Sequence, residues 1–362
     1  MNTPVVVHAH AGNVFGGVET ALCAIASASS HGPVKHRFVL GWDGRLASEL
    51  RRLGAAVEVI GASRLSRPWT VWRARRALRR SLQRSPAAAV LFHSTWALAV
   101  YGPAARQSGS RVACWLHAPM SRGSWLDRRA ATFGPDVWCA NSEYSAALST
   151  WATGGACTVV HPPLPPPELA ESDGGDLPDT GERKVILCAA RLDPDKGHLV
   201  LLDALARLRH RSDWVCWIAG VAPPGRDAYA AVLRSRAEAL GIAANVVWLG
   251  ERRDIPALLK RSWLMCQPNT VPESFGLSFA EALSCGVPVV TSDIGAAAVV
   301  VPDSCGIRCR PHDADAVARA VGLLLSDPSL RSSLSQAGPA HIGQLCDPAL
   351  QTARLVRSMG IG

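Results

Sequence analysis

The sequence contains no long hydrophobic run and no cysteine pattern typical of a metal site. None of its apolar stretches approaches the roughly 18 residues that a membrane-crossing helix requires, so we expect no transmembrane segment. No Cys-x-x-Cys occurs among its 11 cysteines, and Cys305 and Cys309 have no His or Cys nearby at zinc spacing. Several cysteines lie in apolar segments: Cys114, Cys139, Cys188, Cys216 and Cys266. We therefore expect free, buried thiols in a reducing cytoplasm.

Aromatic residues make up only 6% of the chain, and acidic residues are too few to balance the basic ones. The net charge of +9 favours anionic partners such as nucleotide diphosphates or lipid headgroups. No nucleic-acid-binding motif is present, and the positive charge is concentrated in residues 64–84, so we do not expect a nucleic-acid partner. The first ten residues lack a basic region followed by an apolar core, so they predict a first strand rather than a secretory signal.

One segment has the composition of a linker. Residues 161–167 are rich in proline, and a polar run follows as far as Glu182, so neither a helix nor a sheet can continue through it. The length favours two domains. The sequence predicts an N-terminal domain over residues 1–162, a linker over 163–182 and a second domain over 183–345.

Short apolar runs alternate with helical patterns on both sides of this linker, which predicts an α/β fold with two doubly wound, Rossmann-like domains. Such domains bind ligands beyond the carboxyl ends of their strands, and if those ends face each other the central cleft is the active site. The expected strands are residues 4–10, 36–41, 56–60, 88–92, 111–116, 137–141, 157–161, 184–189, 214–220, 245–249, 263–266, 287–291 and 305–309.

Glu273 and Glu281 lie on either side of a predicted turn and the first turns of a helix that ends at Gly286. The unpaired N–H groups of a helix N-terminus suit a phosphate, and Gly276 lets a ligand approach the backbone. A carboxylate beside a diphosphate would be repelled, so each Glu is better suited to accept hydrogen bonds from neutral hydroxyls. A nucleotide-sugar has hydroxyls on both sides of its diphosphate and fits this pattern.

This segment resembles the E-x7-E motif of the retaining glycosyltransferases of family 4, which have the GT-B architecture. Pro-Glu-x-Phe-Gly precedes the helix and Glu-Ala-x-x-x-Gly-x-Pro-Val-Val follows, and the likeness covers most of residues 184–330 and, more thinly, the first half. The resemblance implies that Glu273 contacts the donor sugar and that Glu281 binds the ribose hydroxyls. It places the turn at the donor nucleotide, through Ser274, Phe275, Gly276 and Leu277.

Arg191 and Lys196 resemble the family's Arg-x4-Lys-Gly pattern. Arg offers a planar fork and Lys a point charge, so both can bind one diphosphate and stabilise it as it leaves, without a metal. A loop ion pair with Asp193 or Asp195 is the alternative. Asp193-x-Asp195 also has the form of a metal-binding D-x-D, but two flanking cations disfavour a divalent metal, and the resemblance implies a metal-independent enzyme without a cofactor.

Gly16 and Gly17 belong to the glycine-rich loop that family members carry after their first strand. Adjacent glycines permit positive φ and bring backbone N–H groups close to a ligand, so we expect contact with the donor phosphate or the acceptor. Glu19 is better explained as a charge in the first turn of a helix. Gly250 follows the expected strand 245–249, and the resemblance implies that the backbone there approaches the nucleobase of the donor.

His117 lies at the carboxyl end of a predicted strand, where relatives carry a His near the donor sugar. The resemblance implies a hydrogen bond to a sugar hydroxyl rather than proton abstraction, and a histidine satisfied at a domain surface is the alternative. His8, His10 and His93 also lie on or after strand ends, and we do not rank them.

Residues 64–84 are rich in arginine and contain no acid. Pro68 suits a helix start, and Val71, Ala74, Leu78 and Leu82 form an apolar stripe at helical spacing. Two interpretations remain open for the helix 68–84: a surface helix with solvated arginines, or an attachment to anionic lipid headgroups that brings a lipid-linked acceptor to the first domain.

These residues together predict a retaining hexosyltransferase-type enzyme that moves a sugar from a nucleotide-diphosphate donor to a hydroxyl of a glycan, a lipid-linked acceptor or a small molecule. The GT-B resemblance also implies that a C-terminal helix within 346–362 crosses back to the first domain. The alternatives are a nucleotide-sugar epimerase or phosphorylase of similar fold and a non-catalytic nucleotide-binding subunit. One departure is that residues 295–300 lack the acid of the Gly-Gly-x-x-Glu that relatives often show.

Overall fold

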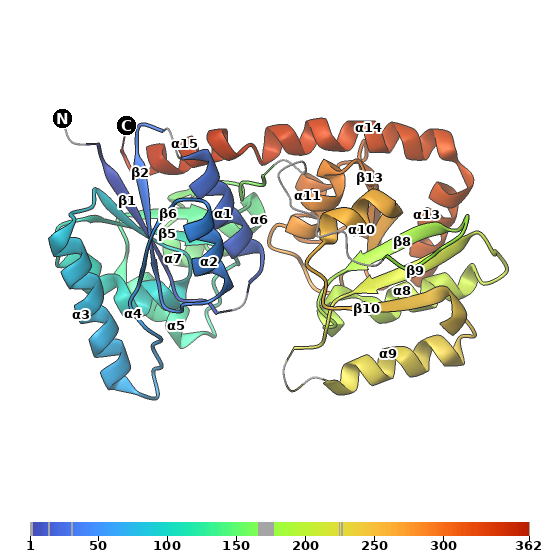
Figure 1. The fold of residues 1–362 in the computed structure, drawn as a ribbon, viewed down its shortest axis with the longest axis horizontal. Coiled ribbons are helices and arrows are strands. Elements are labelled where there is room, and N and C mark those ends of the chain that lie inside the picture. Colours follow the sequence, from blue (N-terminus) through green and yellow to red (C-terminus); the bar gives the residue numbers. More distant parts are fainter. Residues whose placement is uncertain are drawn as a thin grey trace. The chain divides into compact units, whose positions relative to one another are not determined.

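Two α/β units, each built around a parallel sheet, make up the chain in this computed structural model (Figure 1). The structure describes residues 3–13, 15–29, 32–165, 177–223, 225 and 227–361. Unit 1 comprises Met1–Leu164 and Cys346–Gly362, and unit 2 comprises Pro165–Leu345. Residues 166–176 of the predicted linker 163–182 lie outside the described residues.

Unit 1 has a seven-stranded sheet in the order β3-β2-β1-β4-β5-β6-β7, with every neighbouring pair parallel. The predicted strands are confirmed, with ends that differ by one or two residues. The strands are β1 Val5–His10, β2 Lys35–Leu40, β3 Ala56–Val59, β4 Ala89–Phe92, β5 Arg111–Leu116, β6 Val137–Ala140 and β7 Cys157–Val159. The helices are α1 Gly17–Ala28, α2 Arg45–Arg52, α3 Pro68–Arg84, α4 Thr95–Arg106, α5 Trp125–Phe133, α6 Glu143–Leu148, α7 Thr150–Thr153 and α15 Pro348–Ser358.

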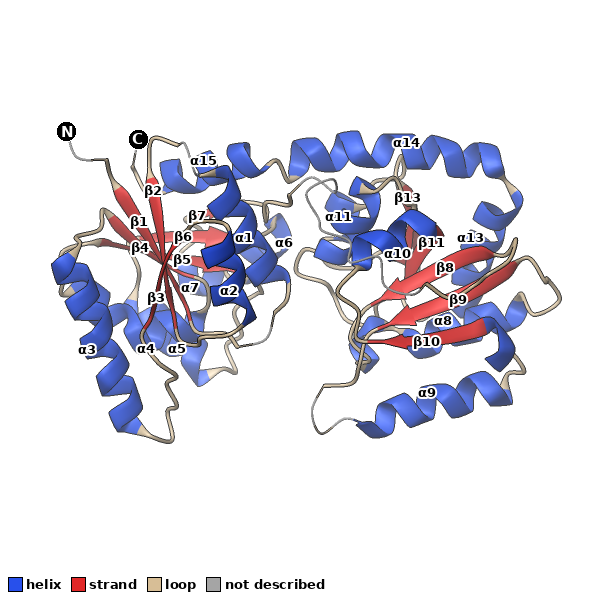
Figure 2. Ribbon diagram, in the orientation of Figure 1, coloured by secondary structure: helices blue, strands red, loops and turns tan. Residues whose placement is uncertain are grey.

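Side chains alternate between the two faces of this sheet, and each face has its own helices (Figure 2). Val6 of β1 packs with residues of α1, α2 and α15, whereas Val7 packs with residues of α3 and α4. Leu355 of α15 is fully buried in the first of these layers, so the C-terminal segment is part of the unit 1 core.

Unit 2 has a six-stranded parallel sheet in the order β10-β9-β8-β11-β12-β13. Its strands are β8 Lys184–Ala189, β9 Trp214–Ala219, β10 Val246–Gly250, β11 Ser262–Gln267, β12 Val289–Ser292 and β13 Gly306–Cys309. Its helices are α8 His198–Arg207, α9 Asp227–Ala239, α10 Ile255–Arg261, α11 Leu277–Ser284, α12 Ala297–Val300, α13 Ala314–Ser326 and α14 Pro328–Leu345, with short 3₁₀ turns at Pro194–Lys196 and Ala243–Asn245. The strand and helix predictions for this half are also confirmed.

All 11 cysteines are unpaired, and most are buried, as the sequence predicts. Burial raises the pKa of the Cys188 thiol to about 12, so this thiol stays protonated and is a poor nucleophile. Among the described residues, no helix combines the length and the apolar character that a bilayer crossing demands.

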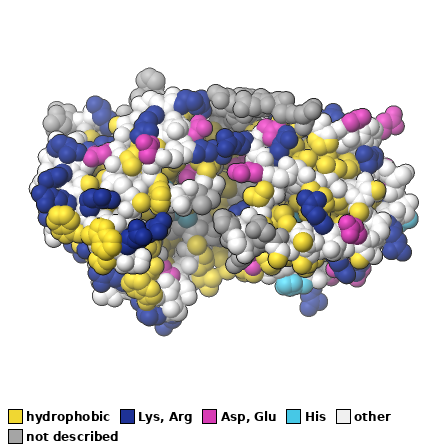
Figure 3. Space-filling model, turned by 60° about the horizontal axis from the view of Figure 1, so that its bottom comes forward, with side chains coloured by type: hydrophobic (Ala, Val, Ile, Leu, Met, Phe, Trp, Pro, Cys, Tyr) yellow, Lys and Arg dark blue, Asp and Glu magenta, His cyan; other side chains and the backbone are white. Residues whose placement is uncertain are grey.

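The predicted basic helix is present as α3. The apolar stripe formed by Val71, Ala74, Leu78 and Leu82 is buried against the sheet layer, as expected from its helical spacing. Trp69 and Trp72 are 63% and 62% exposed. In the space-filling view, hydrophobic side chains lie among Lys and Arg side chains on the left, where Figure 1 places α3 (Figure 3).

Candidate functional site

Lys196 and Glu273 form an ion pair in unit 2, with 2.6 Å between Nζ and Oε2. Asn269 Nδ2 donates to the same carboxylate oxygen at 2.8 Å, and Gln267 Nε2 donates to Asn269 Oδ1 at 2.8 Å. The other oxygen, Oε1, has no hydrogen-bond partner among the described residues. Glu273 is therefore held from one side and can accept a hydrogen bond from a ligand hydroxyl at the other.

The backbone brings these two side chains together. Lys196 ends the turn after β8 and Glu273 lies in the loop after β11, the strand that pairs with β8. Thr270 N donates to Asp195 O at 3.0 Å, which ties the loop to the turn. Gly197 has a φ of +73°, and a Cβ there would lie 1.8 Å from Pro268 O, so only glycine allows this close approach.

The backbone of Glu273 is fixed from a third segment. Ala296 N donates to Glu273 O at 3.0 Å, and Gly295 pairs with Glu273 in an isolated parallel bridge. A Cβ on Gly295 would lie 2.4 Å from Glu273 O. Gly295 and Ala296, which begin the segment that departs from the family pattern, thus position Glu273 through their backbone.

The predicted donor-binding turn, Ser274 to Leu277, leads into α11. Gly276 precedes the helix with a φ of +97°, and a Cβ there would lie 2.5 Å from the Phe279 ring, so this glycine is required by local geometry. The Phe275 side chain is buried. The first N–H groups of a helix have no acceptor inside it, so the start of α11 is suited to an anion.

Glu281 lies further along α11, partly buried, and has no hydrogen-bond or ion-pair partner among the residues that the structure describes. Burial raises its pKa to about 7. An unpaired buried carboxylate is unfavourable to the fold, and strongly shifted groups of this kind occur at functional sites.

Arg191 is exposed and forms no ion pair within the described ranges, so its guanidinium is available to a ligand. Asp193 Oδ1 accepts from the Asp195 N–H at 3.4 Å and caps the turn that holds Lys196. The alternative, an ion pair of Lys196 with Asp193 or Asp195, is not what the structure shows, because Lys196 is paired with Glu273.

No group of three or more His, Cys, Asp or Glu among the described residues is arranged to hold a metal ion.

Gly250 ends β10 with a φ of +66°, and its carbonyl accepts from Gly220 N at 2.7 Å. A Cβ on Gly250 would meet no atom of the described residues within 4 Å, so these residues leave open space beside it. The described residues therefore leave room for a ligand at Gly250, and its place beside the nucleobase stays a prediction.

The glycine-rich loop of unit 1 leads directly into α1. Gly16 has a φ of −157° and Gly17 begins the helix, so neither residue uses the positive φ that glycine permits, and their contact with a ligand stays a prediction. The helix starts here, and Glu19 Oε2 accepts from Gly16 N at 2.9 Å, while its Oε1 lies 2.7 Å from His10 Nε2. Gly12 is the glycine required for packing, because a Cβ there would lie 2.5 Å from His10 Nε2.

His117 directly follows β5, and its Nε2 lies 3.2 Å from Nδ1 of His93. Asn141 Nδ2 donates to the His117 backbone carbonyl at 3.1 Å. Burial lowers the pKa of His117 to about 3, so the ring is neutral at physiological pH. A neutral imidazole donates from one nitrogen and accepts at the other, which suits a hydroxyl.

Sequence reasoning missed three polar residues around these positions: Gln267, Asn269 and His36. Gln267 ends β11 and Asn269 follows it just before the Glu273 loop, and polar residues at the end of a buried strand are a pattern that could have identified them. His36 lies on the same face of the sheet as His8, on the neighbouring strand. This can be recognised only when the strand order is known.

Comparisons with known proteins identify similar chains. The family model of glycosyl transferases group 1 matches residues 174–341. The GDP-mannose-dependent alpha-(1-6)-phosphatidylinositol monomannoside mannosyltransferase of Mycolicibacterium smegmatis is 32% identical over 281 residues, which span 69% of this chain and 70% of that one. A D-inositol 3-phosphate glycosyltransferase of Salinispora tropica is 35% identical over 175 residues, 46% of this chain and 36% of that one. These transferase names disfavour the epimerase alternative.

Solved structures share the fold. The structure of Anabaena HepE in complex with UDP and glucose aligns with a TM-score of 0.84 and 22% identity, covering 98% of this chain and 99% of that one. WaaG, a glycosyltransferase involved in lipopolysaccharide biosynthesis, aligns with a TM-score of 0.70 and 16% identity, covering 99% and 100%. At these identities the likeness concerns the fold, which is GT-B.

Proposed function

Because this chain belongs to the glycosyl transferases group 1, we propose that it moves a sugar from a nucleotide-diphosphate donor to a hydroxyl acceptor. The observation that carries the proposal is the cluster in unit 2 in which Glu273 is paired with Lys196 at 2.6 Å beside the start of α11. A sugar diphosphate needs three features: a cation for its charge, a group that accepts a hydrogen bond from a sugar hydroxyl, and helix N–H groups for its phosphate oxygens.

The ion pair also resolves an electrostatic conflict. A free carboxylate would repel a neighbouring diphosphate, but Lys196 neutralises Glu273 and leaves its Oε1 able to accept from a sugar hydroxyl. Arg191, which is exposed, supplies the second cation. We propose that both cations stabilise the charge that grows on the diphosphate as the glycosidic bond breaks, so that no metal is required.

We further propose that the chain is a retaining enzyme of family 4 and that Glu273 and Glu281 form its E-x7-E motif. Glu281 would then accept from the ribose hydroxyls. Glu273 is engaged with Lys196 and Asn269, which makes it unsuited to act as a covalent nucleophile. This favours a same-face reaction in which the leaving phosphate helps to deprotonate the acceptor, and the new bond keeps the α configuration of the donor.

The acceptor side is assigned to unit 1, with His117 as a hydrogen-bond partner of a substrate hydroxyl. We propose that the acceptor is lipid-linked and reached at an anionic membrane surface through α3. Its exposed Trp69 and Trp72 can insert among headgroups, and each well-placed arginine contributes about 1 kcal/mol. The Mycolicibacterium relative is named for a phosphatidylinositol monomannoside acceptor, which supports a lipid of this kind.

Co-sedimentation with vesicles tests the membrane contact. The chain should bind vesicles of phosphatidylserine at low salt and should not bind vesicles of phosphatidylcholine. Replacement of Trp69 and Trp72 by Ala should reduce binding, whereas Trp125→Ala, at a site that is 54% exposed on α5, should not. Equal binding by both variants would contradict the role of α3.

Label transfer tests the function itself. The purified chain is incubated with radiolabelled GDP-mannose or UDP-glucose, with EDTA and without added metal, in the presence of a bacterial lipid extract. We expect label in the lipid fraction, lost in Glu273→Gln and kept in the matched control Glu238→Gln on the exposed face of α9. Restoration of activity only by manganese would overturn metal independence, and interconversion of the donor without transfer would overturn the proposed reaction.

A further inference from the structure

Four side chains of unit 2 form a line of hydrogen bonds that ends at Glu273. Ser278 Oγ donates to Gln267 Oε1 at 3.3 Å, and Gln267 Nε2 donates to Asn269 Oδ1 at 2.8 Å. Asn269 Nδ2 then donates to Glu273 Oε2 at 2.8 Å. Gln267 and Asn269 are only 1% and 2% exposed, so little water reaches these contacts. The Glu273 carboxylate is thus tied to a residue in the first turn of α11.

The chemistry of these groups sets the direction of every bond in the line. The Glu273 carboxylate only accepts, so Asn269 must turn its amide nitrogen toward Glu273 and its amide oxygen toward Gln267. Gln267 must then turn its nitrogen toward Asn269 and its oxygen toward Ser278, whose hydroxyl donates. A reversed amide at either position would place two acceptors or two donors opposite each other. The line therefore has one favourable orientation from α11 to Glu273.

The backbone that carries the two amides is fixed by neighbouring segments. Gln267 ends β11, and its carbonyl oxygen accepts from Thr291 Oγ1 of β12 at 2.8 Å and from Asn269 N at 3.0 Å. Pro268 lies between the two amides, and its carbonyl oxygen lies so close to Gly197 that a Cβ there would be 1.8 Å away. Both amides are therefore held in place before any ligand binds.

Asn269 and Lys196 contact the same oxygen of Glu273, Oε2. Lys196 supplies the opposite charge from the turn after β8, whereas Asn269 supplies a neutral donor whose direction is set by Gln267. Two donors that reach one oxygen from different segments fix the rotation of the carboxylate about its side-chain bond. Oε1 is thereby kept as the oxygen that can accept from a ligand.

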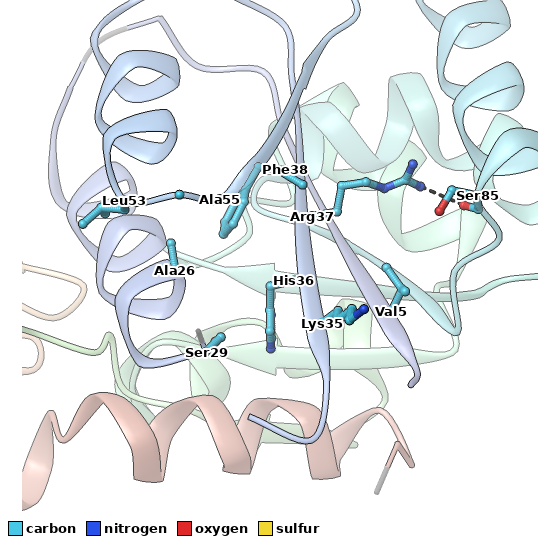
Figure 4. A pocket seen from close by; sticks show the side chains of 12 residues that line it. Val5, Ala26, Ser29, Lys35, His36, Arg37, Phe38, Leu53, Ala55 and Ser85 are labelled. Atoms are coloured by element: carbon cyan, nitrogen blue, oxygen red, sulfur yellow. Dashed lines mark hydrogen bonds between the residues drawn. The ribbon is translucent and has the colours of Figure 1, made fainter. Parts of the chain in front are cut away.

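The polar side chains around a cavity of unit 1 lack this convergence. The cavity has a volume of about 400 Å³ and lies at the amino end of β2. Arg37 points toward Ser85 and donates to its carbonyl oxygen at 3.0 Å, whereas His36 points away from them, from the other face of the strand (Figure 4). These groups share no common point, so we assign no ligand to this cavity.

We propose that Asn269, held by Gln267 and Ser278, is a positioning residue that turns Oε1 of Glu273 toward the donor sugar. The proposal rests on the proposed function, in which Glu273 accepts from a hydroxyl of that sugar. Asn269 acts on the sugar only through Glu273. The line from Ser278 keeps the carboxylate in a fixed place relative to the start of α11, where we place the diphosphate. The sugar and the diphosphate are thus bound with a fixed spacing.

The first test needs no substrate. Asn269→Asp keeps the size of the side chain but places a second carboxyl against Glu273. The nearby charged groups are Glu273 itself and, on the turn after β8, Lys196 and Asp195. A neighbouring carboxylate raises the pKa of the introduced carboxyl. Below that pKa its proton can replace the amide N–H as the donor to Glu273, and above it two like charges oppose each other.

Urea unfolding of Asn269→Asp and the wild-type chain from pH 5 to pH 8 measures this effect. The folded variant binds more protons than its unfolded chain, so its unfolding midpoint should fall relative to wild type as pH rises. Gln336→Glu, the same amide-to-acid change at an exposed position of α14, is the matched control and should differ from wild type equally at each pH. A constant difference in Asn269→Asp as well would overturn the contact with Glu273, whether or not the chain is a transferase.

The second test separates the sugar from the nucleotide. Asn269→Ala should lower kcat/KM for UDP-glucose or GDP-mannose, whichever the wild-type chain uses, by about tenfold, because a hydrogen bond to a charged group is lost. Calorimetry should show wild-type affinity for UDP or GDP alone, because the role of Glu273 concerns the sugar. Gln267→Glu should lower kcat/KM at pH 8 as well, since an ionised carboxylate there draws the Asn269 amide nitrogen away from Glu273.

Two results of the second test would overturn the role of Asn269. An equal loss of UDP or GDP binding in Asn269→Ala would show that the residue only supports the fold of its loop. Wild-type kcat/KM in this variant would show that Glu273 needs no positioning. A wild-type chain that transfers neither sugar would contradict the proposed function and this role with it, whereas the unfolding test decides the contact by itself.

Discussion

Glu281 is partly buried and has no partner in the part of the chain that the structure describes, and this has opposite consequences for stability and for binding. Its pKa is raised from 4.5 to about 7 in the folded chain. The folded state therefore binds more protons than the unfolded state between these values, and stability is lost as pH rises through this window. A residue kept for packing would not carry this cost.

Replacement of Glu281 by Gln should make the chain more stable at pH 8. The variant removes a partly buried charge that has no partner among the described residues, so we expect the free energy of unfolding to rise by about 2 kcal/mol. Urea unfolding at pH 8 and at pH 4.5 measures this, and the difference should disappear at the lower pH. Glu238→Gln is the exposed control and should be neutral. A loss of stability at pH 8 would show that Glu281 has a structural partner.

Nucleotide binding should depend on pH in the opposite sense. The ionised carboxylate accepts from two ribose hydroxyls, whereas the protonated form presents a donor to them. The affinity for a nucleoside diphosphate should therefore fall by about tenfold as pH drops from 8 to 6, following the pKa near 7. Titration calorimetry checks this. The Glu281→Gln variant should bind weakly with a flat pH profile, and an equally steep profile in it would assign the titration to another group.

At the scale of elements, the site depends on three loops held together by backbone contacts. The turn after β8, the loop after β11 and the segment after β12 meet around Glu273, and glycines allow the closest approaches. Gly197 makes the tightest of these, since a Cβ would lie 1.8 Å from Pro268 O. The close backbone approach of Gly197 to Pro268 therefore fixes where Lys196, the preceding residue, lies.

Gly197→Ala should disrupt the site. The φ of +73° is strained for alanine, and the clash is with backbone that cannot rotate away, so we expect a loss of stability of about 2 kcal/mol or more and a loss of nucleotide binding. Thermal unfolding and calorimetry measure both. Gly241→Ala, at a φ of +67° with open space around it, is the matched control and should keep binding. Wild-type binding in Gly197→Ala would show that the turn can move without consequence.

At the scale of the whole molecule, residues Cys346–Gly362 return to unit 1 and form part of its core. Leu355 of α15 is fully buried among residues of β1, β2 and α1, whereas Leu350 of the same helix is 49% exposed. Leu355→Ala should destabilise unit 1 by about 2–5 kcal/mol, and Leu350→Ala should have little effect. Differential scanning calorimetry should show one unfolding transition moving in the first variant only. Movement of the unit 2 transition alone would contradict the assignment.

Much of this architecture could be predicted from the sequence, because buried parallel strands appear as short apolar runs separated by amphipathic helices. The strand bounds and α3 follow from this local pattern. The Lys196–Glu273 pair could not, since its members are 77 residues apart and meet only through the pairing of β8 with β11. The expected ligand contact of Gly16 and Gly17 stays a prediction. The contacts that join His36, His8, His93 and His117 need the strand order β2-β1-β4-β5, which composition does not encode.

The most direct test of the account is a thermal-shift measurement against UDP-, GDP-, ADP- and TDP-sugars without metal. It compares the wild-type chain with Glu281→Ala, whose folding is checked by circular dichroism. We predict that one donor raises the melting temperature of the wild-type chain and that the variant loses this response. If no donor shifts the folded wild-type chain, or if Glu281→Ala responds as strongly, the nucleotide-sugar site does not lie where we place it.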